Sequence, residues 1–261
     1  MKREFVILVL IDIVDSVKWI ERLGDVKSTQ QMKIYNRIFR GLLIKYQGVE
    51  IDKTDGALLI FERMRDALRY IDEYHRLVEH HLKLRSRVGV HCGEVIMHHN
   101  HDLFISRGAK LIEVDGLQKS IAARIMSVAS AGQTLLSGPA GEYASAVRGD
   151  QVLKDLGKFK LKGVYKPMNL WAISSSAKRL KRPKNTDKVK YVRAPKLTPE
   201  QQVQRFWRCT LYPYLSLLLL RELMMIMSMI ELMGACPRLY LMEMSRAIGV
   251  IVSFIHGLFY F

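Results

Sequence analysis

The chain has 261 residues and a formal net charge of +16, from 41 Lys and Arg against 25 Asp and Glu. This length supports one domain of ordinary size and a further segment. Its three cysteines, Cys92, Cys209 and Cys236, lack the paired spacing of a zinc site and the number that a disulfide framework needs. We therefore expect a reducing, cytoplasmic setting, and the short apolar run at the N-terminus is not that of a signal peptide.

The positive charge is concentrated in one segment. Between Ser176 and Arg205 the chain has ten basic and two acidic residues, so about half of the excess lies there. We expect residues 176–204 to form a basic linker. The linker has no interleaved stacking aromatics apart from Tyr191, so no nucleic-acid partner is expected.

Apolar spacing and turn residues predict a domain over residues 1–175. They indicate, in order, a buried strand at 5–13, two helices within 16–46 separated at Gly24-Asp25, a hairpin at 48–61, a helix at 64–84, two strand segments within 86–98, a helix at 116–130, a strand at 133–137 and a hairpin at 158–173. Because hairpins alternate with helices, the order favours an α+β fold with helices on a mostly antiparallel sheet.

Residues 205–261 form a hydrophobic, Met- and Leu-rich tail that we expect to be helical. Charged residues interrupt it at Arg221, Glu222 and Glu231, so no segment has the 18 uncharged apolar residues of a spanning helix. Two alternatives stay open. The tail forms amphipathic helices on an anionic membrane, held there by the basic linker, or a helix pair that dimerises.

Three polar residues stand out against this apolar framework. Asp12 ends a buried strand, where a carboxylate is costly unless a cation or hydrogen-bond donors meet it. Asp55 lies in an Asp-Gly turn, where it either has only the structural role of a turn residue or also binds a ligand. Arg124 lies in a helix of small residues, where a phosphate could approach or the side chain could simply be solvated.

Two histidine features are expected to have structural rather than catalytic or metal-binding roles. His91 lies on an alternating strand, which is typical of a packed or hydrogen-bonded core residue. The cluster His98-His99-Asn100-His101 has the composition of a metal-binding tract, but an exposed loop after a strand is expected and no metal is placed there.

Five motifs in chain order resemble the class III nucleotide cyclase catalytic domain, the family of most adenylate and guanylate cyclases. They are VLIDIVDSV, DKTDGALLIF, RVGVHCGEV, SIAARIM followed by AGQTLLS, and LKGVYKPMNLW. The resemblance spans Phe5 to about Ile173. It implies a ferredoxin-like βαββαβ core and the conversion of a nucleoside triphosphate to a 3′,5′-cyclic nucleotide and pyrophosphate.

The same resemblance implies the site. Asp12 and Asp55 would hold two Mg²⁺ or Mn²⁺ ions, with the main-chain carbonyl of Ile13 as a further ligand, and Arg124 would reach the α-phosphate. The family builds its site at a head-to-tail dimer interface, with the metals from one chain and the arginine from the other, so a homodimer is implied.

The positions that read the base depart from the family pattern. Candidate substrate-binding or catalytic residues on this alignment are Ile51, Lys53, Glu113, Ser120, Lys160 and Lys162. Ile51 stands where adenylate cyclases commonly have a lysine, Glu113 where they have an aspartate, and Ser120 where they have an asparagine. Lys53 could replace the lysine, and Lys160 and Lys162 lie near the family's triphosphate-binding lysine.

ATP is favoured as substrate on family frequency alone. The alternatives are the same reaction on GTP or a pyrimidine triphosphate, and a non-catalytic cyclase-like signalling or dimerisation module. The catalytic domain is expected in the cytoplasm, with its tail either free of the plasma membrane or attached to the inner face.

Overall fold

The computed structural model describes residues 2–54, 56–175 and 180–192, together with eight residues between 214 and 225. The chain divides into two compact units, Met1–Ala194 and Pro195–Phe261. The eight described residues of the second unit are helical, as expected of the tail. Most of the predicted basic linker and tail lies outside the described residues, so their membrane or dimerisation role stays a prediction. No helix among the described residues is long and apolar enough to cross a membrane.

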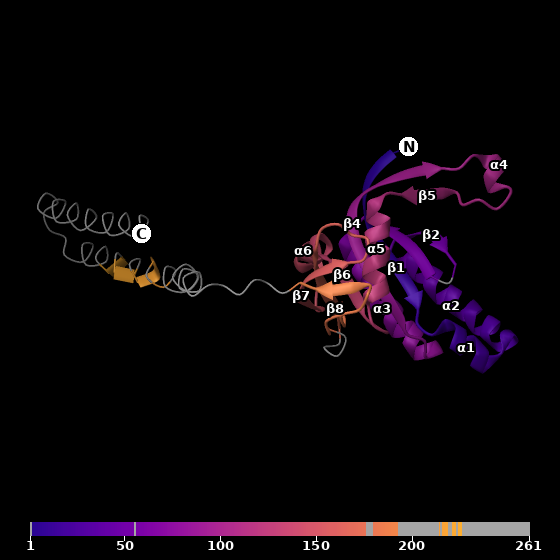
Figure 1. Ribbon diagram of the computed structural model, residues 1–261, viewed down its shortest axis with the longest axis horizontal. Helices are drawn as coiled ribbons and strands as arrows, with labels where there is room; N and C mark the ends of the chain where they lie inside the picture. The colour runs from indigo at the N-terminus through magenta and orange to yellow at the C-terminus, as the bar shows by residue number, and fades with distance from the viewer. Residues whose placement is uncertain are drawn as a thin grey trace, which may run out of the picture. The chain divides into compact units, whose positions relative to one another are not determined.

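The first unit is an α+β structure, as predicted (Figure 1). Its strands are β1 (Lys2–Ile13), β2 (Val49–Lys53), β3 (Gly56–Phe61), β4 (Ser86–His99), β5 (Ile112–Asp115), β6 (Thr134–Ser137), β7 (Val152–Leu161), β8 (Met168–Ser174) and β9 (Val189–Tyr191). Its helices are α1 (Ser16–Leu23), α2 (Asp25–Lys45), α3 (Met64–Leu82), α4 (Asp102–Ile105), α5 (Leu117–Val128) and α6 (Gly138–Val147).

The described strands form one sheet in the order β2-β3-β1-β4-β6-β8-β7-β9, and β5 pairs with β4. Only the β4–β6 pair in this sheet is parallel, so the prediction of a mostly antiparallel sheet is confirmed. β1 lies between β3 and β4 and pairs with β4 along its whole length.

Alternation along β1 divides the core between two sheet faces. Ile7, Val9 and Ile11 pack with residues of α2 and α3, and this side is called the α2/α3 face. Val6 and Leu8 pack in a cluster that includes Ala122 of α5, and this side is called the α5 face. Both faces of β1 are therefore covered from Val6 to Ile11, which explains why that part of the strand is apolar without interruption.

The α2/α3 face is filled by aromatic side chains. Tyr35, Phe39, Tyr70 and Tyr74 stack or meet edge to face with ring centroids 5.7 to 6.3 Å apart. The Tyr74 hydroxyl lies 3.0 Å from that of Tyr35 and 2.7 Å from Ser86 Oγ, so this buried polar group is paired. Burial raises the pKa of Tyr74 to about 12, so it stays neutral.

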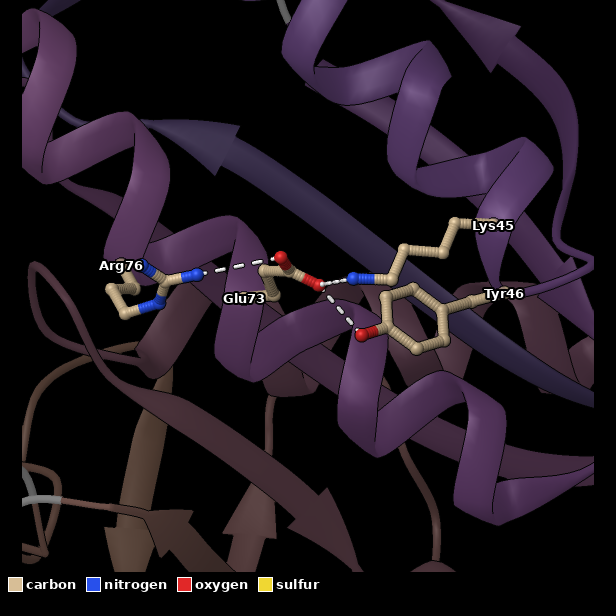
Figure 2. A network of polar contacts seen from close by, with 4 residues as sticks. All are labelled: Lys45, Tyr46, Glu73 and Arg76. Atoms are coloured by element: carbon tan, nitrogen blue, oxygen red, sulfur yellow. Dashed lines mark hydrogen bonds and ion pairs between the residues drawn. The ribbon is translucent and has the colours of Figure 1, made fainter.

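A polar network joins α2 to α3 at the surface (Figure 2). Glu73 accepts hydrogen bonds from Lys45 Nζ at 2.7 Å and the Tyr46 hydroxyl at 2.6 Å, and Arg76 lies 3.3 Å away. The hydrogen bond from Lys45 is the main cause that lowers the pKa of Glu73 below its usual value. The ionised carboxylate is therefore the form that stabilises this contact.

We expect Glu73→Gln to lower the free energy of unfolding by about 1 kcal/mol at neutral pH. Because the pKa of Glu73 is lowered in the folded state, its contribution is present above the unfolded-state pKa and is lost as the pH falls through the folded-state value. Urea unfolding of both proteins at neutral pH and below pH about 4 measures this. A difference that is the same at both pH values would contradict the prediction.

The structure differs from the sequence-based expectations in three places. Residues 86–99 form a single strand rather than two, because β4 pairs continuously with β1 past Gly93. The elements α4, β5 and α6 were not predicted. The first unit also extends past the expected boundary at Ser175, because β9 pairs with β7 and Leu180 and Val189 are buried with it.

Candidate functional site

Asp12 lies at the end of β1, on the α5 face. Its cross-strand partners are Gly56 on β3 and Arg87 on β4. Arg87 donates to Asp12 Oδ2 from Nε at 2.7 Å and lies 2.6 Å away through Nη2. The sequence predicts that this carboxylate needs a cation or hydrogen-bond donors, and Arg87 supplies the donors. The negative charge at the end of β1 is therefore paired.

The other carboxylate oxygen of Asp12 faces the β2–β3 turn. A Cβ built on Gly56 would lie 3.9 Å from Asp12 Oδ1 and 2.8 Å from the Ile11 carbonyl oxygen, so only glycine fits at this position. Within the described part of the chain, Oδ1 makes no hydrogen bond or ion pair. Asp55 itself lies outside the described residues, but its neighbours Thr54 and Gly56 are joined by a 2.9 Å hydrogen bond that closes the turn.

These residues fit a divalent cation. An uncommitted carboxylate oxygen next to a turn that contains a second aspartate is the oxygen-rich donor set that Mg²⁺ and Mn²⁺ prefer. The side chain of Ile13 is buried, so only its main chain could contribute a ligand.

Arg124 and Ser120 are exposed on α5, one helical turn apart. Arg124 Nη2 lies 3.9 Å from a Cβ built on Gly163, in the turn between β7 and β8. Lys162 precedes that glycine and is exposed. The structure therefore brings Arg124 and Lys162 into one region, and the Arg124 guanidinium has no partner among the described residues.

Within one chain, the side chains of Asp12 and Arg124 lie toward different halves of the sheet, with α5 between them. α5 packs over β4, where Met126 covers Gly89 and Gln118 covers Gly93. The sheet order places the β1–β3 pair on one side of β4 and the β6, β8 and β7 strands on the other. Asp12 belongs to the first side and the Arg124 side chain reaches the second, so these two predicted site residues are separated within a single chain.

The two base-reading candidates on β2 do not share a face. Ile51 is buried in the α5-face cluster with Leu58 and Ile60, so it is a core residue and does not face a substrate. Strict alternation would put Lys53 on the same face as Ile51, but a β-bulge between Glu50 and Asp52 breaks the alternation and that expectation is wrong. The Lys53 ammonium lies 5.5 Å from the Tyr35 ring centroid, on the α2/α3 face, and burial lowers its pKa.

Glu113 and Lys160 are also turned away from the α5 face. Glu113 is the cross-strand partner of His98, while its neighbour Val114 is the residue buried in the α5-face cluster. A hydrogen bond from Asn100 is the main cause that lowers the pKa of Glu113. Lys160 pairs with Lys190, and its neighbours Phe159 and Leu161 pack with α5. Neither residue is brought to Asp12 or Arg124 within the chain.

The structure confirms the prediction that His91 is a hydrogen-bonded core residue. Its Nδ1 lies 2.7 Å from Ser137 Oγ and its Nε2 lies 2.6 Å from Gln118 Oε1, and burial lowers its pKa. Arg87 is the site residue that sequence reasoning missed. The available signal was a charged residue at the start of the buried strand RVGVHCGEV, next to a strand that ends on Asp12.

A cavity of about 720 Å³ lies elsewhere in the first unit, and its lining includes Arg65 and Arg69 of α3 and Arg148 after α6. None of the predicted site residues lines it. Asp12 is instead partly buried at the end of β1, and Arg124 is exposed on α5.

The sequence matches no protein-family model and no curated protein at a significant level. Solved structures do resemble it. An adenylate cyclase of Trypanosoma brucei superimposes with a TM-score of 0.59 at 19% identity, covering 72% of this chain and 95% of that one. The guanylate cyclase domain of RhGC from Catenaria anguillulae, in complex with GTP, gives 0.58 at 15% identity, covering 66% and 98%.

The adenylyl cyclase CyaB from P. aeruginosa gives a TM-score of 0.56 at 17% identity, covering 69% of this chain and all of that one. These neighbours are thus covered almost completely by this chain, whose first unit carries the predicted motifs in order. The first unit of this chain has the fold of a class III nucleotide cyclase catalytic domain.

Proposed function

We propose that this protein is a nucleotide cyclase that converts a nucleoside triphosphate, with ATP favoured, to a 3′,5′-cyclic nucleotide and pyrophosphate. The observation that carries the proposal is Asp12, whose Oδ1 has no partner among the described residues and faces the β2–β3 turn. A cyclase fold with no chemistry would not need a partly buried carboxylate at the end of this strand, next to a turn whose sequence contains a second aspartate.

Asp12 and Asp55 would hold two divalent ions, with the Ile13 carbonyl as a further ligand. When bound, the ions offset negative charge on the attacking 3′-oxygen and on the leaving pyrophosphate. Arg124 would donate hydrogen bonds to the α-phosphate oxygens as the 3′-oxygen attacks in line. Ser120, one turn away on α5, would donate its hydroxyl to the same nucleotide, and Lys162 would meet the triphosphate.

The proposed active form is a homodimer with two sites. Within one chain Asp12 and Arg124 lie on opposite sides of α5, so a head-to-tail partner is needed to bring an arginine to the metal-holding aspartates. This separation supports a site shared between two chains.

GTP is the second candidate substrate. The positions that would read the base support GTP. Ile51 is buried, and Lys53 and Glu113 lie on the other face of the sheet. The α5 face therefore has no counterpart of the lysine and aspartate that recognise adenine in adenylate cyclases. The fold accommodates GTP in the Catenaria domain.

The test is to incubate the purified full chain with each of the four ribonucleoside triphosphates and Mn²⁺, and to measure cyclic nucleotide and pyrophosphate. We expect equal amounts of both products from one purine nucleotide, and none from the Asp55→Ala protein. If the wild-type protein yields no cyclic product from any of the four nucleotides, the proposal of cyclase activity is refuted. The non-catalytic signalling or dimerisation module is then the remaining hypothesis.

A further inference from the structure

A histidine and two carboxylates meet on the β4–β5 ribbon, away from the proposed active site. His98 of β4 is the cross-strand partner of Glu113 on β5, and Asp115 lies two residues farther along the same strand. His98 Nε2 is 3.5 Å from Glu113 Oε2, and His98 Nδ1 is 3.6 Å from Asp115 Oδ2. One ligand atom from each of the three residues lies within 4.8 Å of the others.

The pleat of the ribbon explains why these side chains converge. Residues 113 and 115 point to the same side of β5, and a directly paired residue on the next strand points there too. The intervening Val114 is buried on the α5 face. The cluster therefore lies on the opposite face of the sheet from Asp12 and is a separate place on the molecule.

A supporting hydrogen bond orients one carboxylate. Asn100 Nδ2 donates to Glu113 Oε1 at 2.9 Å and to the Lys110 carbonyl oxygen at 2.8 Å. With Oε1 engaged, Oε2 is the oxygen that faces His98. Protein metal sites use such outer hydrogen bonds to fix their carboxylate ligands.

Charge also favours a cation here. Glu113 and Asp115 are like charges on one side of a strand, and a neutral imidazole between them offsets neither. The nearby Lys110 ammonium is 2.7 Å from Asp52 and is engaged there. The charges of Lys110 and Lys119 also act on Glu113, and a bound cation would add a positive charge shared by both carboxylates.

We infer that His98, Glu113 and Asp115 form a binding site for a divalent transition-metal ion of the Zn²⁺ type. One imidazole nitrogen and two carboxylate oxygens suit Zn²⁺ and its neighbours, with water completing the coordination, whereas Mg²⁺ prefers oxygen ligands alone. The ligand atoms need to move by about 1 Å to reach coordination distances near 2 Å.

Occupancy of this site would connect the ribbon to the helix that carries Ser120 and Arg124. Asp115 is followed by Gly116 and then by α5, and Lys110, in the loop that leads into β5, is paired with Asp52 near the β2–β3 turn. The ion would therefore restrain both neighbours of the proposed active site. The metal-binding claim itself does not depend on cyclase activity.

The experiment is a titration of untagged full-length protein with Zn²⁺ by calorimetry, in excess Mg²⁺ so that the oxygen-only sites are filled. We expect one Zn²⁺ per chain for wild type, at least about tenfold weaker binding for His98→Gln and Asp115→Asn, and a smaller loss for Asn100→Ser. The matched controls are His99→Gln, the next residue of β4 on the other side of the ribbon, and His101→Gln. Both are expected to bind as wild type does.

A second readout keeps the test independent of folding. Thermal unfolding without metal shows that each variant is folded, and added Zn²⁺ should raise the Tm of wild type and His99→Gln but not of His98→Gln. The inference is overturned if wild type binds no stoichiometric Zn²⁺, if His98→Gln binds as wild type does, or if His99→Gln or His101→Gln loses as much affinity as His98→Gln.

Discussion

Mixing Asp12→Asn protein with Arg124→Ala protein is expected to restore cyclase activity that neither has alone. Each substitution should lower the rate about a hundredfold or more, because each removes a charge that acts on the transition state. In a heterodimer one site receives intact aspartates from one chain and the intact arginine from the other. With random exchange, about half of the dimers are mixed and each has one intact site, so about a quarter of wild-type activity should return.

The control for this mixing is the Asp12→Asn, Arg124→Ala double variant combined with the Asp12→Asn protein. No dimer of that pair has an intact site, so activity should stay at background. The shared site would be refuted if the first mixture also stayed at background after heterodimers had been demonstrated, for example by mass spectrometry of differently labelled chains.

Gly89→Ala is expected to be among the most damaging single substitutions in the first unit. A Cβ at this position of β4 would lie 2.4 Å from the main-chain nitrogen of Met126 and 2.7 Å from its Cα, so α5 would have to move off the sheet. Overpacking of this kind costs about 1–3 kcal/mol, and a main-chain clash gives no flexible side chain to yield. Cyclase activity should fall as well, because the same helix carries Ser120 and Arg124.

Gly41→Ala is the matched control for Gly89→Ala. Gly41 lies within α2, and a Cβ built there meets nothing within 4 Å. Alanine favours the helix over glycine, so this protein should gain roughly 0.5–1 kcal/mol. Urea unfolding followed by far-UV circular dichroism compares the two variants. Gly89→Ala protein as stable as Gly41→Ala protein would contradict the close approach of α5 to β4.

Much of the fold follows from local sequence patterns. The apolar run of β1, the Gly24 break between α1 and α2, and the Asp-Gly hairpin are all properties of neighbouring residues, and the structure confirms each of them. Short elements with weak patterns were missed, because α4 and β5 are only four residues long and their form depends on pairing with distant parts of the chain.

The β2 bulge shows where alternation alone fails. Strict period-2 reasoning puts Ile51 and Lys53 on one face, but a single extra residue opposite β3 sends Lys53 to the α2/α3 face. No pattern within the five residues of β2 marks the position of the bulge, since it is set by pairing with β3.

The fold class, the ordered motifs and the residue types of the proposed site could be predicted from the chain alone, because these depend on periodicity and on chemistry at particular positions. The partners of those residues could not be predicted and are known from the three-dimensional structure. Strand register joins Asp12 to Arg87, and helix packing turns Arg124 toward Gly163, away from Asp12. Ribbon pairing brings His98 between Glu113 and Asp115. Such contacts join residues from separate strands and helices, and local sequence does not encode the register that brings them together.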